Sequence, residues 1–93
     1  MDQQTLNQTA YDEYELWDTL LNDIWSYLKE TMDPVSFEVL SLEEREWVKK
    51  KEAKIRSDAA NFEGGSMQPM IEYGSGAEIT KSRVEELLGT YVK

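Results

Sequence analysis

Apolar residues in the first third of the chain recur at intervals of three and four, with polar residues between them. These apolar positions are Leu6, Ala10, Tyr14, Trp17, Leu21, Ile24, Leu28 and Met32. Residues at this spacing share one face of an α-helix and no Gly or Pro interrupts them, so a long helix is predicted over about residues 5–32. Leu20, Trp25 and Tyr27 widen the apolar face, which indicates that this helix contacts more than one neighbour.

A second helix is predicted to begin directly after Asp33-Pro34. Asp is favoured as an N-cap residue, and Pro is favoured at the first helical position. The segment that follows is rich in helix-forming residues, and Trp47 and Ile55 fall on one face of it. The second helix is therefore predicted over about residues 34–61.

Two interpretations of this second helix remain open at Ser41. Ser41 and Glu44 have the spacing of a capping box, which would divide the segment into a short helix and a long one. The alternative is one continuous helix, bent near residue 41. We prefer the continuous helix, because Leu40 and Leu42 leave no loop between the two parts.

Glycine and proline separate the second helix from the last one. Gly64 and Gly65 follow the second apolar pattern, at a place where a left-handed residue would end a helix. A loop is predicted over residues 63–76, because this range also contains Pro69 and further glycines. An amphipathic pattern then predicts a third helix over about residues 77–90.

These elements predict an all-α fold in a single domain spanning residues 1–93. Because the first connection is short, the first two helices are expected to form a long antiparallel helical hairpin. The shorter C-terminal third helix, which follows the Gly-rich loop, closes the open side of this hairpin and buries the apolar faces.

The hairpin geometry predicts which polar residues face one another. With the turn near Asp33, residues whose numbers sum to about 66 lie opposite each other, so Asn22 faces Glu44 and Asp18 comes near Lys51. We expect these polar groups to satisfy one another at mid-height and to fix the register of the hairpin. An acid–base site is the disfavoured alternative, because neither a nucleophile nor a His accompanies the carboxylates.

Cys and His are both absent from the 93 residues. The chain therefore has no disulfide, no thiolate metal ligand and no imidazole to act as a general base. We predict no enzyme activity, no metal and no cofactor. Apolar runs of two or three residues are too short for membrane insertion, and export would require a signal peptide upstream of Met1.

Acidic residues dominate the chain, whose formal charge is −9. Residues 1–46 carry twelve Asp and Glu against Lys29 and Arg45, a balance of −10. Residues 47–56 carry five basic residues against Glu52, a balance of +4. An acidic surface opposes binding to nucleic acid and favours a cationic protein partner. The simpler interpretation is that the charge only keeps a small domain in solution.

Four short motifs follow one another along about residues 7–90. Asp18, Leu21, Asn22 and Trp25 form D-x-x-L-N-x-x-W. Leu40, Glu44-Arg45, Trp47-Val48 and Lys51-Glu52 form L-x-x-x-E-R-x-W-V-x-x-K-E. Glu63-Gly64-Gly65-Ser66 forms a Gly-Gly-Ser loop, and Ile79-Thr80, Arg83 and Leu87 form I-T-x-x-R-x-x-x-L. In this order and at this spacing, the motifs resemble those of the LprI-type lysozyme inhibitor domains.

The chain departs from the pattern of that family at several positions. Many members carry two cysteines, and this chain has none. Glu44 replaces a Gln and Lys51-Glu52 replaces Arg-Asp, which changes charge and hydrogen-bond geometry. The resemblance implies a structural polar cluster, and no inhibitory residue is carried over with it. The expected members of this cluster are Asp18, Asn22, Glu44, Trp47, Lys51 and Arg83.

The resemblance implies a non-enzymatic, exported domain of the cell envelope that binds a cationic protein such as lysozyme. The candidate partner-contact loop is Gly64, Gly65 and Ser66, where a hydroxyl and free backbone N–H groups would approach catalytic carboxylates. An ordinary helix stop is the simpler interpretation of this loop. The alternative function is a structural or adaptor module of a bacterial lipoprotein without inhibitory activity. The sequence makes no prediction of the oligomeric state.

Overall fold

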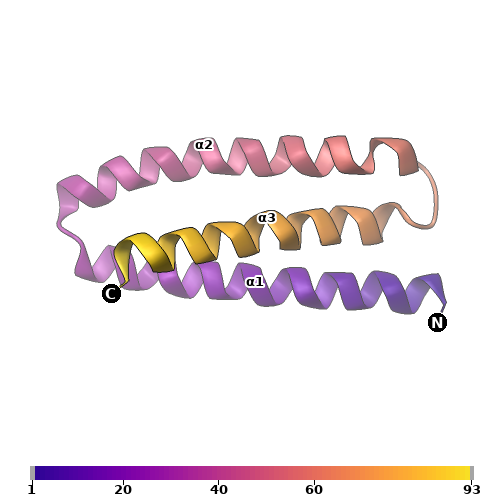
Figure 1. Ribbon diagram of the computed structural model, residues 1–93, viewed down its shortest axis with the longest axis horizontal. Helices are drawn as coiled ribbons and strands as arrows, with labels where there is room; N and C mark the ends of the chain where they lie inside the picture. The colour runs from indigo at the N-terminus through magenta and orange to yellow at the C-terminus, as the bar shows by residue number, and fades with distance from the viewer. Residues whose placement is uncertain (1, 93) are drawn as a thin grey trace.

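The computed structural model describes residues 2–92, which form three long helices joined by short connections (Figure 1). The elements are α1 (Gln3–Thr31), α2 (Pro34–Ala59), the 3₁₀ helix η1 (Ala60–Phe62) and α3 (Gln68–Tyr91). The chain reverses its direction after α1 and again after α2, so that α1 and α3 are parallel to each other and antiparallel to α2 (Figure 1). The described residues contain no strand, and the predicted all-α hairpin with a third helix is confirmed.

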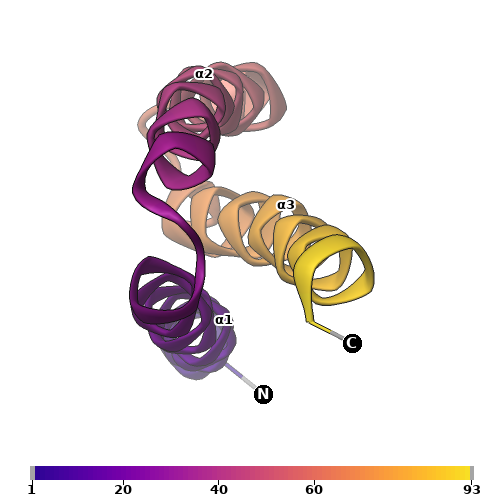
Figure 2. The same cartoon turned by 90° about the vertical axis from the view of Figure 1, so that its left-hand side faces the viewer.

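The three helices lie at the corners of a triangle when the molecule is viewed along its long axis (Figure 2). Contacts of α3 with α1 and α2 are more extensive than those between α1 and α2. Because the three helices are long and lie side by side, the domain is elongated, with extents of 47 × 23 × 16 Å. Within residues 2–92, no helix combines the length and the hydropathy that crossing a membrane requires.

The apolar core lies toward the end of the molecule that holds the α1–α2 turn. Its buried members are Leu21, Ile24, Leu28, Leu40, Val84 and Leu87. The rings of Trp25 and Phe37 pack against this core with centroids 5.0 Å apart, and they join α1 to α2 beside the turn. All three helices thus contribute to one core, as expected for helices that each have a single apolar face.

The predicted boundary between the first two helices is confirmed. The Asp33 carboxylate accepts a hydrogen bond from the Ser36 backbone N–H at 2.9 Å, and Pro34 occupies the first turn of α2. No break occurs at Ser41, whose hydroxyl donates to the Phe37 carbonyl at 2.9 Å within a continuous helix. The continuous version of the second helix is therefore the observed one, and the capping-box alternative is not.

The predicted loop over residues 63–76 is wrong from residue 68 onward, because α3 begins at Gln68 and not near residue 77. Pro69 lies in the first turn of α3, where Pro needs no N–H partner. The added turns pack on α1, since the ring of Tyr73 lies 5.1 Å from that of Tyr11. Tertiary packing thus stabilises a helix that its glycines alone would disfavour.

Candidate functional site

Arg83 is the centre of the polar contacts between α2 and α3. Its side chain is 3% exposed, and its Nε donates to Glu44 Oε1 at 2.7 Å. Its Nη1 donates to Glu43 Oε1 at 3.0 Å and also to Glu86. Burial by itself lowers the pKa of Arg83, but these hydrogen bonds outweigh burial, and the pKa is raised above its ordinary value. A guanidinium that stays charged therefore fixes α3 on α2.

Lys51 of α2 lies over one aromatic ring of α1 and one of its own helix. Its Nζ lies 5.1 Å from the centre of the Tyr14 ring and 5.6 Å from that of Trp47. A second lysine, Lys81 of α3, lies 5.7 Å from the ring of Trp17 on α1. Both distances to α1 are within the range of cation–π attraction, so these two lysines link α2 and α3 to α1. Neither takes part in an ion pair within residues 2–92.

The expected pairing of Asp18 and Asn22 with Glu44 and Lys51 does not occur. Within residues 2–92, no hydrogen bond or ion pair joins these two α1 residues to α2, and Asn22 is exposed. The register rule assumed that α1 and α2 pack face to face along their length. In the structure α3 contacts both helices, and Arg83 of α3 is the partner of Glu44.

The loop Gly64, Gly65 and Ser66 connects η1 to α3 and is exposed. Gly64 has φ +80°, a backbone conformation in which a Cβ would be strained. Its N–H donates to Gln68 Oε1 at 2.8 Å, and the Gly65 N–H donates to the Phe62 carbonyl at 3.0 Å. The two glycine N–H groups are therefore used inside the loop, and the expectation that they are free is wrong.

An acidic stripe follows the outer face of α1, opposite the helix face that forms the core. We call the α1 acidic stripe the four exposed residues Asp12, Glu15, Asp23 and Glu30. At about 100° per residue the four acids lie within a sector of about 80° of the helix, and the exposed Asn22 lies just beyond its edge. The ion pairs of residues 2–92 all use acids of α2 and α3. The carboxylates of the stripe thus face solvent and make no ion pair within the described helices, and the hydrogen bond that Asp12 accepts from Gln8 Nε2 at 2.9 Å stays within α1.

Two further titratable groups have shifted pKa values with evident structural causes. Hydrogen bonds from Lys54 and then from Ser75 lower the pKa of Asp58, which links α2 to α3. The pKa of Tyr11 is raised, first by its hydrogen bond to Glu15 and then by the charge of that carboxylate. Within the described residues, no group of three metal-binding side chains converges on one point.

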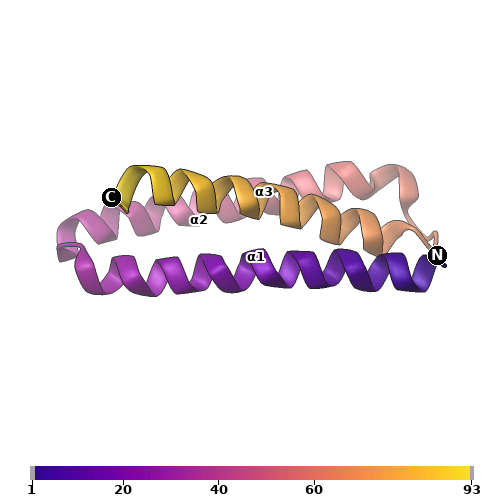
Figure 3. The same cartoon turned by 60° about the horizontal axis from the view of Figure 1, so that its bottom comes forward.

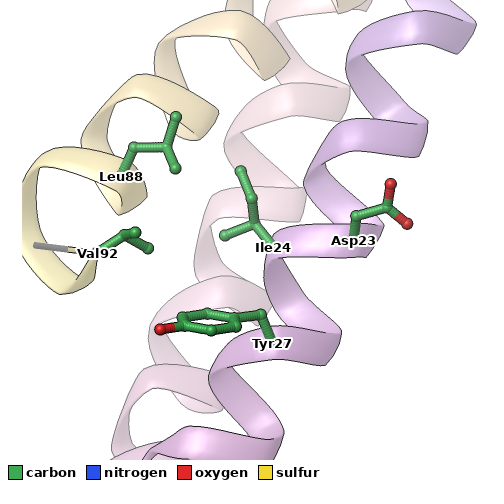
Figure 4. A pocket seen from close by; sticks show the side chains of 5 residues that line it. All are labelled: Asp23, Ile24, Tyr27, Leu88 and Val92. Carbon is green, nitrogen blue, oxygen red and sulfur yellow. The ribbon is translucent and has the colours of Figure 1, made fainter.

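A shallow apolar groove separates the C-terminal halves of α1 and α3. Figure 3 shows α3 close to α1 at its N-terminal end and farther from it toward its C-terminus. The groove has a volume of about 210 Å³, and Figure 4 shows its lining side chains. Ile24 and Tyr27 face Leu88 and Val92 across it, while the Asp23 carboxylate points away. This volume is below the usual range for small-molecule sites, so it suits at most one side chain of a partner.

Neither of these surfaces was predicted from the sequence. The excess of acids in residues 1–46 is the signal for the stripe, and only the helical positions of these acids show that they share one face. The groove was indicated by Tyr27, which widens the apolar face of the first helix. Its extent depends on the divergence of α3 from α1, which no local pattern predicts.

Comparison with known proteins connects this arrangement to one family. Residues 1–87 match the family model described as "Lysozyme inhibitor LprI". Neither the comparison with curated proteins nor the comparison with solved structures found a match. The matched range includes α1, α2 and most of α3, and thus all residues of the Arg83 contacts and of the α1 acidic stripe.

Proposed function

We propose that this chain, which belongs to the LprI lysozyme inhibitor family, is a non-enzymatic exported domain that binds a cationic protein of the lysozyme class through the outer face of α1. The observation that carries the proposal is the α1 acidic stripe. Its carboxylates share one exposed face and take no part in the ion pairs that hold the described helices together. A partner therefore engages them without breaking the fold.

The negative charge of the chain favours a cationic protein over other classes of partner. The chain has a formal charge of −9, so it attracts a basic protein over a distance of about 10 Å at moderate ionic strength. Such attraction mainly accelerates association and selects against acidic partners, including nucleic acid. Binding to lysozyme, which is strongly basic in the animal type, is expected to weaken as salt is added.

Ser66 in the loop that precedes α3 is the second contact in this proposal. Its glycine neighbours use their N–H groups within the loop, so the contact is assigned to the exposed serine. The loop lies beside the N-terminal part of α1, because Asn7 Nδ2 donates to the Ser66 carbonyl at 3.2 Å. Ser66 thus lies near the end of α1 at which the stripe begins, on a neighbouring side of the helix, so a partner contacts it only by extending beyond the stripe.

The polar cluster has a structural role in this proposal. Glu44 and Arg83 hold α3 on α2, while Lys51 holds α2 on α1 through the ring of Tyr14 and also lies over Trp47 of its own helix. Asp18 and Asn22 of α1 take no part in these contacts. Both lie on the helix beside the α1 acidic stripe. We place the domain in the cell envelope, in keeping with the extracellular activity of lysozymes.

A cell-wall clearing assay tests the function directly. Purified chain is added at micromolar excess to lysozyme acting on a suspension of cell walls, and loss of turbidity is followed with time. The proposal predicts slower clearing, together with binding of the chain to lysozyme in a titration without cell walls. Absence of both effects rejects it. Binding without slower clearing instead favours an adaptor module that lacks inhibitory activity.

A further inference from the structure

Three aliphatic side chains on α2 are exposed to solvent on the side of the helix away from the core. Val35 is 73% exposed, Val39 is 62% exposed and Leu42 is 56% exposed. Their spacing of four and then three places them on one face, which points away from the buried Leu40. Single exposed aliphatic residues are ordinary, whereas a contiguous row of them marks an interaction surface. We call these three residues the α2 aliphatic row.

The spacing of the row is that of a helix–helix seam. Continued along α2, the same alternation of four and three reaches Glu46, Lys49 and Ala53. Glu46 and Lys49 form an exposed ion pair with each other, at 3.1 Å. The apolar part of the seam is therefore confined to the first half of α2, and any partner helix must be centred there.

Two unpaired charges flank the row on one side. Glu38 and Arg45 are both exposed and seven residues apart, so they lie on the same side of α2, two turns from each other. Within residues 2–92, neither takes part in an ion pair or a side-chain hydrogen bond. The row thus carries one acid and one base that a partner has to match.

We propose that the α2 aliphatic row is the interface of an antiparallel homodimer, in which α2 of one copy packs on α2 of a second copy. A two-fold axis at the level of Leu40 and Ser41 places Val39 of each copy against Leu42 of the other. The same axis brings Glu38 of each copy beside Arg45 of the other. A second copy is therefore the occupant whose charges complement both flanking residues at once.

The size and charge of this interface predict a weak dimer. Only the two Val39–Leu42 pairs are aliphatic on both sides, because this axis places Val35 of each copy against Glu46 of the other. They cover less area than a standard stable interface, and two chains of charge −9 repel each other. Added salt screens that long-range repulsion, whereas the apolar contact is not weakened by salt. Association is thus expected to persist at high salt, where binding of a cationic protein through α1 weakens. The dimer does not depend on the proposed function.

Sedimentation equilibrium of the full chain from about 10 to about 500 µM tests the proposal, since weak interfaces associate only in this range. The proposal predicts a dimer fraction that rises with concentration. Leu42→Glu abolishes association, whereas Leu16→Glu leaves it unchanged, because Leu16 is a similarly exposed leucine on α1. Circular dichroism checks that both variants remain helical.

A charge exchange tests the antiparallel arrangement itself. Glu38→Arg and Arg45→Glu, each alone, place like charges together twice in the dimer and weaken association about tenfold. The double variant restores opposite charges at both places and recovers association. A chain that stays monomeric throughout, equal effects of Leu42→Glu and Leu16→Glu, or no recovery in the double variant would each overturn the proposal.

Discussion

The α-carbon of Gly76 on α3 lies directly against the ring of Tyr14 on α1. A Cβ at position 76 would fall inside van der Waals distance of Cδ2 and Cε2 of Tyr14. Lys51 of α2 lies over the same ring, so all three helices meet at Tyr14. A glycine in the interior of a helix costs stability, and here the close approach of two helices requires it.

Substitutions at Gly76 and at Gly74 are therefore expected to change the stability of the fold in opposite directions. Gly76→Ala lowers the free energy of unfolding by about 1 kcal/mol, because overpacking outweighs the gain in helix propensity. Gly74→Ala raises it by about 0.5–1 kcal/mol, because a Cβ at position 74 meets no atom within 4 Å. Urea denaturation of the three proteins measures both changes. If both variants gain stability, the close contact with Tyr14 is not present.

Removal of the buried guanidinium is predicted to be far more damaging than removal of a surface charge. Arg83→Met leaves Glu44, whose side chain is 16% exposed, without its partner and lowers the free energy of unfolding by about 3 kcal/mol. Lys49→Met breaks an ion pair that is largely exposed and changes stability by less than about 0.5 kcal/mol. Equal losses in the two variants would show that Arg83 is not fixed between α2 and α3.

Stability is predicted to depend on the charge of the α2 N-cap at low pH. Hydrogen bonding to the Ser36 N–H lowers the pKa of Asp33 below its ordinary value of 3.8. A carboxyl whose pKa is lower in the folded chain stabilises the fold above pH 3.8, and this contribution disappears as pH falls through the folded pKa.

The variant Asp33→Asn isolates that contribution, because Asn caps a helix without carrying a charge. We expect the wild type to have the higher melting temperature at neutral pH, with a difference that shrinks as the pH falls below 3.8. Thermal melts of both proteins across this range, followed by circular dichroism, measure it. A difference that grows on acidification would contradict the assignment.

Local signals in the sequence were sufficient for the first two helices. Asp33 and Pro34 define a helix start through their own side chains, and the structure confirms it. The start of α3 was not predicted, because a glycine such as Gly76 is typical of a loop. Only its contact with Tyr14 explains why a glycine stands inside a helix at this position. That contact joins residues far apart in the chain, so no window along the sequence contains it.

The polar contacts were predicted only in part for a related reason. Glu44 and Arg83 were both expected in a polar cluster, and they do form an ion pair. Asn22 was placed opposite Glu44 by a rule for two helices, but the third helix changes which faces meet. The arrangement of three helices depends on the sum of their side-chain contacts, which spacing alone does not determine.

The affinity of the chain for lysozyme shows directly whether the outer face of α1 binds a cationic protein. One variant changes the α1 acidic stripe to Asp12→Asn, Glu15→Gln, Asp23→Asn and Glu30→Gln. The matched control removes the same number of exposed acids elsewhere, through Glu52→Gln, Glu63→Gln, Glu78→Gln and Glu85→Gln. In isothermal titration at low salt, we expect the stripe variant to bind about tenfold more weakly than the control. Equal affinities for the two variants would contradict it.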